Sequence, residues 1–159
     1  MKEWLATVAR LVTGGVWVVA GAIKLPDPFA SVRAVRAYDL LPESVVPTVG
    51  HLLPVVEIVV GLALLLGLLT RGAAVVSAVL FAMFVVGIAS VWARGIEIEC
   101  GCFGGGGAKP GASSAYPWEI ARDGGLFLLS GFVVWVGRSR LALDNALFRT
   151  TGARVPEGS

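Results

Sequence analysis

The residues in this sequence best suited to chemistry are its two cysteines, Cys100 and Cys102, which a single glycine separates. The sequence has no third cysteine, so a scaffold with several disulfides is excluded and a reactive or metal-binding pair remains. A disulfide between positions i and i+2 requires a bent backbone, which Gly101 permits. We expect the glycines that follow, from Gly104 onward, to keep the loop flexible and both sulfurs reachable. A small, strained disulfide of this kind is typical of labile, catalytic sites.

Other interpretations of the same segment stay open. The two cysteines could form a permanent local disulfide or remain as two inert thiols. Together with His51 they could bind a soft metal, but a fourth ligand is not evident, and we predict no metal site. A phosphate-binding loop is disfavoured, because the glycine run lacks the GK[ST] signature and a preceding strand.

A second set of polar residues lies within apolar segments. Glu57 is about 12 residues into a long apolar run, or roughly 18 Å deep if the run is helical. An ionised carboxylate at that depth is costly, so we expect Glu57 to face other helices and to pair with a base. Arg122 is the first candidate base and Lys24 the second, while Asp123 pairs with whichever base remains. This set could be a structural ion pair, or it could handle protons or a quinone. His51, nearer the expected outer interface, is interpreted as a hydrogen-bonded interface residue.

Composition places all these residues in a membrane protein. Hydrophobic residues make up 56% of the 159-residue chain and charged residues only 15%, and the mean hydropathy is +0.81. A soluble domain averages about 25% charged residues. The net charge of +2 is small, and the absence of a basic run argues against a nucleic-acid partner. Four apolar runs predict four membrane spans, at residues 4–23, 45–69, 73–92 and 117–137.

We therefore predict an all-α membrane protein in which a bundle of four transmembrane helices occupies residues 1–137. The proline-rich loop at 25–44 is expected to hold a short amphipathic helix. The polar segment 94–116 carries the cysteines, and residues 138–159 form a basic tail. The first run could instead be a cleaved signal peptide, since Ala20-Gly21-Ala22 resembles a cleavage site, although the run is long for one.

The distribution of arginines predicts the orientation. An even number of spans places both termini on the same side of the membrane. Arginines after the fourth span, such as Arg138 and Arg140, favour a cytoplasmic C-terminus. Both termini are then cytoplasmic, and the cysteines face the extracytoplasmic side of the cell membrane. Disulfide chemistry is favoured there, because that compartment is oxidising.

Several short patterns in the sequence are similar to those of a known family. They are Lys24 at the end of the first run, Leu41-Pro42, Pro54-x-x-Glu57-x-x-x-Gly61, Thr70-Arg71, Cys100-Gly101-Cys102-Phe103-Gly104 and Arg122-Asp123. Together, over residues 4–137, they resemble the MauE branch of the DoxX-like membrane proteins, and the cysteine pattern is the most specific of them. The resemblance implies a four-helix bundle associated with thiol redox and similar in outline to vitamin K epoxide reductase.

The resemblance also implies an expected function for this chain, from the roles of the proteins that it is similar to. MauE assists maturation of the disulfide-rich small subunit of methylamine dehydrogenase, and DoxX relatives are linked to thiosulfate–quinone oxidoreduction and to oxidative-stress complexes. Vitamin K epoxide reductases use a CxxC and a second cysteine pair, and this chain lacks both. Any disulfide exchange would therefore be with another protein or a small thiol.

We accordingly predict a membrane thiol–disulfide redox protein in contact with lipid. Cys100 and Cys102 would exchange electrons with a thioredoxin-like or disulfide-bearing protein outside the cytoplasm, in a MauE-like role in maturation and methylamine utilisation. One alternative is a non-catalytic assembly subunit with a static disulfide. The other is a quinone-coupled thiol oxidoreductase, and a quinone is the cofactor that it would use.

Overall fold

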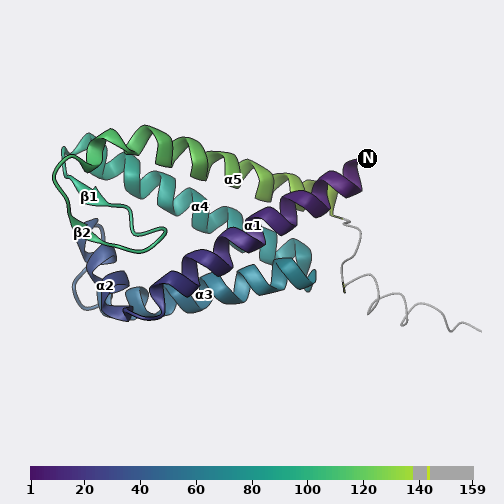
Figure 1. The fold of residues 1–159 in the computed structure, drawn as a ribbon, viewed down its shortest axis with the longest axis horizontal. Helices are drawn as coiled ribbons and strands as arrows, with labels where there is room; N and C mark the ends of the chain where they lie inside the picture. The colour runs from purple at the N-terminus through teal and green to yellow at the C-terminus, as the bar shows by residue number, and fades with distance from the viewer. Residues whose placement is uncertain (138–142, 144–159) are drawn as a thin grey trace, which may run out of the picture.

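The computed structural model describes residues 1–137 and residue 143, so the predicted basic tail lies outside the described residues except for one position. The molecule is mainly helical, with one two-stranded hairpin (Figure 1). In chain order the elements are α1 (Lys2–Lys24), α2 (Pro28–Ala37), α3 (Val46–Leu66), α4 (Thr70–Ala93), β1 (Ile98–Glu99), β2 (Gly107–Ala108), the 3₁₀ helix η1 (Ala112–Ser114) and α5 (Tyr116–Val136).

Four long helices form the body of the molecule, and α2 and the hairpin lie together at one of its ends (Figure 1). Helix α1 packs against α3 and α5, and α4 packs against α5. The buried core contains Trp17, Leu64, Phe81 and Val133, one residue from each long helix. A polar contact crosses this core, because Trp17 Nε1 donates a hydrogen bond of 2.7 Å to the hydroxyl of Ser77. The core thus joins all four long helices.

Glycines allow α1 and α3 to approach each other closely. A Cβ atom at Gly14 would lie 3.0 Å from the carbonyl oxygen of Gly61, and one at Gly61 would lie 2.8 Å from that of Gly14. Small residues at such positions let membrane helices pack backbone against backbone. This close contact brings Lys24, the last residue of α1, beside Glu57 of α3.

Within the described residues, three helices are long and apolar enough to cross a membrane, namely α1, α3 and α4. Helix α5 has the same length as α3, 21 residues, but Glu119, Arg122 and Asp123 lie near its N-terminus. The predicted all-α membrane protein is therefore confirmed, whereas a fourth crossing by α5 stays a prediction. Apolar side chains such as Val59, Val79 and Leu128 are exposed on the outer faces of the bundle, where they suit contact with lipid.

The turn between α3 and α4 differs from the prediction. Hydropathy predicts a helix through Leu69, followed by a turn at residues 70–72. In the structure α3 ends at Leu66, because Gly67 adopts a left-handed conformation with φ of +69° and caps the helix. Helix α4 begins at Thr70, so residues 70–72 form its first turn. Apolar residues continue across this turn, and hydropathy alone therefore does not mark it.

Helix α2 is the short amphipathic helix predicted within residues 25–44. It begins at Pro28, and the Asp27 side chain caps it by accepting a hydrogen bond of 3.1 Å from the Ala30 N–H. Its buried face lies against α3, where a Cβ at Gly50 would be 2.6 Å from the Val32 Cα. Helix α2 is therefore fixed to the bundle by a close backbone contact.

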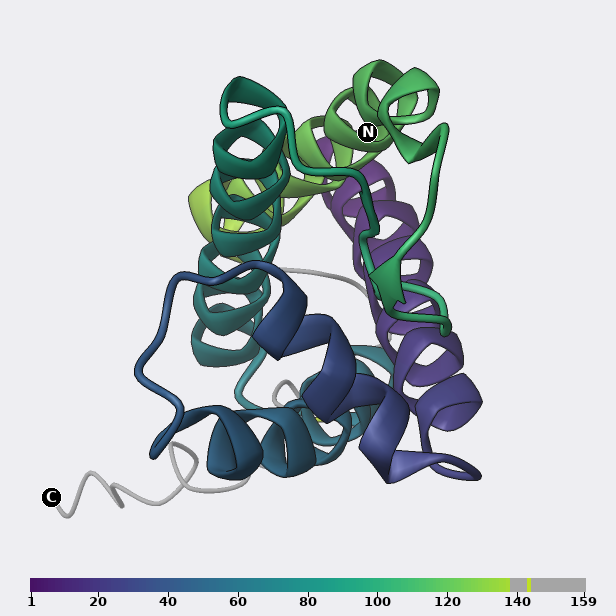
Figure 2. The same cartoon turned by 90° about the vertical axis from the view of Figure 1, so that its left-hand side faces the viewer.

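The hairpin is seated on α2. Strands β1 and β2 pair in antiparallel fashion, with Ile98 opposite Ala108 and Glu99 opposite Gly107. A Cβ at Gly106, in the loop between the strands, would lie 2.7 Å from the Cβ of Ala34 in α2. Figure 2 looks onto this end of the bundle, with α2 and the hairpin facing the viewer. The loop of the hairpin is thus held against a helix.

Candidate functional site

Both cysteines lie in the loop that joins β1 to β2, and both are free thiols. Cys100 is 8% exposed and Cys102 is 6% exposed, so the expectation that both sulfurs are openly reachable is wrong. They pack in an apolar cluster that includes Ile88, Val91 and Tyr116. The physical reason is that Gly101 and Gly106 of this loop fit against Ala34 of α2, and the loop is therefore folded over the thiols.

Gly101 supplies the bend that a pair at i and i+2 needs. Its φ of +68° lies in the left-handed region, which glycine adopts without strain. The N–H of Cys102 consequently points back to the Sγ of Cys100, at 3.5 Å, and the Cys102 Sγ lies 3.9 Å from the carbonyl oxygen of Cys100. A larger residue is excluded at Gly101, because its Cβ would lie 2.6 Å from that of Ala34.

The two thiols have different acidities. The pKa of Cys100 is lowered, because the Cys102 thiol donates a hydrogen bond to it and the Cys102 N–H adds a second. The pKa of Cys102 is raised well above its ordinary value, because its proton is held in the hydrogen bond to Cys100 and because it is buried near the carboxylate of Asp123. Cys100 is therefore the more acidic of the two thiols.

The N-terminal part of α5 brings two of the predicted residues to the thiols. The Cys102 Sγ lies 3.7 Å from the Asp123 Oδ2, and Arg122 Nε holds the other carboxylate oxygen at 2.8 Å. The Arg122 guanidinium also lies over the ring of Phe103, 4.7 Å from its centroid. Arg122 and Asp123 therefore belong to the site of Cys100 and Cys102.

The predicted pairing of Arg122 with Glu57 is wrong, and the second candidate, Lys24, is the partner. Lys24 Nζ lies 2.5 Å from Glu57 Oε1, and both side chains are buried. Lys24 is also stacked over Phe84, with Nζ 5.6 Å from the ring centroid. Glu57 faces α1 across the glycine contact of α1 and α3, whereas Arg122 is held by Asp123 of its own helix.

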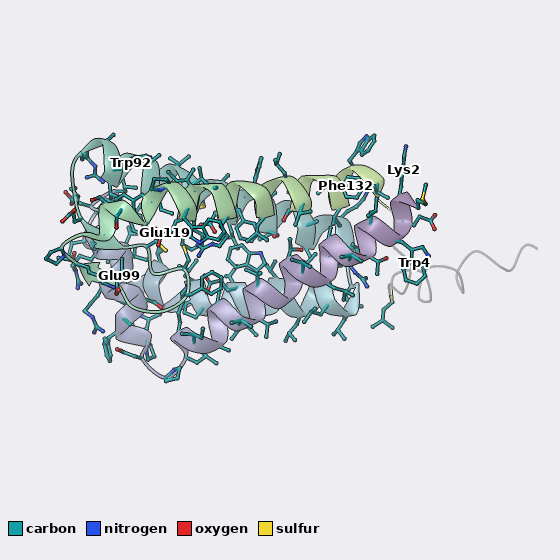
Figure 3. All side chains as sticks on the ribbon, turned by 45° about the horizontal axis from the view of Figure 1, so that its top comes forward. Lys2, Trp4, Trp92, Glu99, Glu119 and Phe132 are labelled. Carbon is teal, nitrogen blue, oxygen red and sulfur yellow. The ribbon has the colours of Figure 1, made fainter. Side chains whose placement is uncertain are left out.

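A polar cavity of about 380 Å³ opens beside Cys100, and Cys102 does not line it. Its charged lining residues are Glu99, Lys109, Glu119 and Arg122. Glu99 and Lys109 form an ion pair of 2.5 Å, which keeps the pKa of Glu99 below its ordinary value. Figure 3 shows Glu99 and Glu119 at the same end of the bundle as Trp92. This cavity gives a ligand access to Cys100.

A comparison with protein families identifies the chain. The family model described as "Methylamine utilisation protein MauE" matches residues 2–136. The chain belongs to the MauE family. No curated protein and no solved structure matches the chain. The family match covers every helix of the bundle, both cysteines and the residues that line the cavity.

An apolar groove lies on the other side of Tyr38 in this MauE-family protein. Its volume is about 180 Å³, and α2, α3 and α4 line it through residues that include Tyr38, Leu53, Met83 and Phe84. The Tyr38 hydroxyl donates a hydrogen bond of 2.8 Å to the carbonyl oxygen of Cys100. Burial raises the pKa of Tyr38, so this hydroxyl keeps its proton. Neither cysteine lines the groove.

The remaining predicted residues have separate places in the MauE fold. His51 is exposed on α3, where its Nδ1 lies 2.7 Å from the Pro47 carbonyl oxygen and its ring contacts Phe29. The described part of the chain contains no group of three or more His, Cys, Asp or Glu side chains that could hold a metal. Gly104 lies against α1, where its Cβ would be 2.7 Å from the Ile23 Cγ2.

Sequence reasoning missed Tyr38, Phe103 and Glu119 as site residues. Glu119 is three positions before Arg122 on one helix, and this spacing was the available signal, since residues at i and i+3 share a face. Phe103 follows the cysteines directly, but only the fold shows that Arg122 stacks on it. No pattern in the sequence connects Tyr38 to residues that lie 62 positions further along the chain.

Proposed function

We propose that this MauE-family membrane protein carries out thiol–disulfide exchange, with Cys100 as the attacking sulfur and Cys102 as the resolving one. The observation that carries the proposal is the unequal placement of the thiols. Cys100 lines the polar cavity, while Cys102 lies behind it against Asp123. The lowered pKa of Cys100 and the raised pKa of Cys102 support the same assignment, because the thiolate is the nucleophile.

The exchange proceeds in two balanced steps. The Cys100 thiolate attacks one sulfur of a partner disulfide, a mixed disulfide forms, and the other partner sulfur leaves as a thiolate. Cys102 then loses its proton and attacks the Cys100 Sγ, which closes the Cys100–Cys102 disulfide and releases the second partner thiolate. The partner disulfide is reduced to two thiols, and the cysteine pair is oxidised by the same two electrons. The reverse sequence oxidises a partner dithiol.

Asp123 is suited to accept the proton of Cys102 in the second step. Its Oδ2 lies 3.7 Å from the Cys102 Sγ, within reach of the thiol proton, and it is buried. Arg122 holds the other oxygen and so fixes the orientation of the carboxylate. Asp123→Asn should prolong the mixed disulfide on Cys100 and leave its formation unchanged, as quenched-flow alkylation would measure.

The proposed partner and orientation are those predicted from the sequence. The family description supports a role in methylamine utilisation, and the partner would be a thioredoxin-like or disulfide-bearing protein outside the cytoplasm. The proposal requires the hairpin to lie on the extracytoplasmic face and both termini in the cytoplasm, with α5 as the fourth span. Reporter fusions at the C-terminus and within residues 94–116 test that orientation, and the proposal requires opposite sides for the two sites.

Trapping tests the exchange itself. In cells that express Cys102→Ser, Cys100 should accumulate a mixed disulfide that a reducing agent releases, because the resolving sulfur is absent. Cys100→Ser is the matched control, and it should trap little, because Cys102 does not line the cavity. If neither variant traps a partner and the wild-type pair stays oxidised under mild reductants, the protein is a non-catalytic subunit with a static disulfide.

The apolar groove supports the second candidate, a quinone-coupled thiol oxidoreductase. The groove is lined by Tyr38 and Phe84, which also pack against the cluster that contains the cysteines. A quinone there would be separated from the sulfurs by these two rings, so direct attack by a thiolate is disfavoured. Oxidation of the reduced cysteine pair by added quinone in nanodiscs, without any disulfide, would establish this candidate.

A further inference from the structure

Two oppositely charged side chains that line the cavity beside Cys100, Glu119 and Arg122, each have one atom without a hydrogen-bond partner. Glu119 Oε2 and Arg122 Nη2 are both buried, and neither has a hydrogen-bond partner among the described residues. They lie three residues apart on α5, yet Arg122 forms its ion pair with Asp123 instead of Glu119. A buried polar atom without a partner is costly, and a charged one more so. A ligand that pairs with both atoms would remove that cost.

We infer that this cavity is a subsite for the disulfide of a small α-amino acid of the cystine type, with its carboxylate on Arg122 and its ammonium on Glu119. The inference rests on the proposed function, because the ligand disulfide is the one that Cys100 attacks. Arginine suits a carboxylate, which it can hold with two parallel hydrogen bonds. The cavity volume of about 380 Å³ is in the range of small-ligand sites.

The other two charges of the cavity do not compete for such a ligand. Glu99 and Lys109 already form an ion pair with each other, and the Glu99 Oε2 also accepts from the Gly106 N–H. Glu119 and Arg122, each with one atom that lacks a hydrogen-bond partner among the described residues, are therefore the two groups that select the ligand. A zwitterion matches both, whereas a dicarboxylate or a diamine matches one and is repelled by the other.

Glu119 also connects ligand binding to the reactivity of Cys100. Its carboxylate acts to raise the pKa of the Cys100 thiol, in opposition to the hydrogen bonds from Cys102. A ligand ammonium that neutralises Glu119 removes this repulsion and increases the thiolate fraction. The zwitterion thus activates the sulfur that attacks it. The step is that of the proposed exchange: cystine is reduced to two cysteine thiols while Cys100 and Cys102 form a disulfide.

A series of four disulfides tests the subsite in the full-length protein, reduced and held in lipid nanodiscs. Cystine carries both charged groups, cystamine only amines, dithiodipropionate only carboxylates, and hydroxyethyl disulfide neither. Alkylation and mass spectrometry measure the rate at which each one oxidises the Cys100–Cys102 pair. Each rate is divided by the rate with a short Cys-Gly-Cys peptide, which corrects for intrinsic reactivity. The corrected rate with cystine should exceed that with each of the other three disulfides by about tenfold, since hydrogen bonds to charged groups contribute this much or more.

Glu119→Gln separates recognition from general reactivity. It should lower the rate at which cystine and cystamine oxidise the cysteine pair by about tenfold. It should leave dithiodipropionate unchanged or faster, because repulsion by the carboxylate is removed. Glu99→Gln is the matched control, since Glu99 also lines the cavity but is paired with Lys109. It should leave the order of the four disulfides unchanged.

Equal corrected rates for the four disulfides, or an equal loss with all four in Glu119→Gln, would overturn the subsite. If hydroxyethyl disulfide still oxidises the pair and Cys102→Ser still traps a partner on Cys100, the subsite alone fails and the exchange function stands. If no disulfide oxidises the pair and nothing is trapped, both proposals fail.

Discussion

Replacing one member of the Lys24–Glu57 ion pair should destabilise the bundle more than replacing both. The side chains are 2% and 0% exposed, so each charge depends on the other. Lys24→Met leaves the Glu57 carboxylate without its base, about 16 Å from the start of α3. Glu57→Leu leaves Lys24 at the last residue of α1, from which its flexible side chain can extend toward the membrane surface. Lys24→Met should therefore be the more harmful of the two.

The magnitude follows from the burial of the pair. Removal of one partner from a buried ion pair costs about 3–5 kcal/mol, and we expect Lys24→Met at the upper end of this range and Glu57→Leu at the lower end. The double variant removes both charges and largely retains side-chain volume. It should therefore lie within about 1.5 kcal/mol of the wild type. The two single effects should thus be far from additive.

Reversible unfolding by dodecyl sulfate in mixed micelles measures these free energies, with tryptophan fluorescence as the signal, since Trp17 lies in the core. The control is the exposed pair of Arg36 and Glu43, whose replacement by Met and Leu should change stability by less than about 1 kcal/mol. A double variant of Lys24 and Glu57 that loses the sum of the two single effects would refute the reasoning, because the charges would then act independently.

Three further predictions concern the hairpin and its thiols. Alkylation of Cys100 should reach half its maximal rate at a pH below the ordinary thiol pKa, because the pKa of Cys100 is lowered and its thiolate persists to lower pH. Cys102→Ala should move this midpoint to higher pH. An unchanged midpoint would contradict the hydrogen bond from Cys102 to Cys100. Gly106→Ala should move the hairpin away from α2 and speed alkylation of both cysteines, since its Cβ would lie 2.7 Å from that of Ala34. Gly107→Ala is the control, because its Cβ would meet nothing within 4 Å, and it should speed alkylation less. Equal effects of the two variants would disprove the packing of the hairpin on α2. Tyr38→Phe should destabilise the fold by about 1 kcal/mol through loss of the hydrogen bond to the Cys100 carbonyl, measured by the same unfolding assay, and an unchanged stability would argue against that bond.

The sequence was sufficient to predict the class of the protein and its family. Hydropathy identifies the apolar helices, because about 20 apolar residues are needed to cross a bilayer. The same measure places the end of α3 too late, because Gly67 terminates the helix by conformation and not by polarity. Burial of a carboxylate predicts that Glu57 has a base, but the choice of Lys24 over Arg122 depends on how the helices face one another.

The environment of the thiols was the least predictable part. A run of glycines is typical of a flexible loop, and local reasoning therefore predicts exposed sulfurs. In the fold, Gly101 and Gly106 lack side chains because α2 occupies that space, and both sulfurs are consequently buried. Contacts such as that of Asp123 with Cys102 join residues 21 positions apart, and they depend on how the hairpin meets α5.

The packing of the hairpin against α2 limits which substitutions related chains can accept. The small side chain of Ala34 in α2 packs directly against Gly101 and Gly106 of the hairpin loop. A side chain at either glycine would clash with Ala34. A larger residue on α2 would have to be accommodated by a shift of the strand ends, since the glycines cannot become smaller. We therefore expect positions 34, 101 and 106 to vary together across the lineage or not at all, even though none of them carries a reactive side chain.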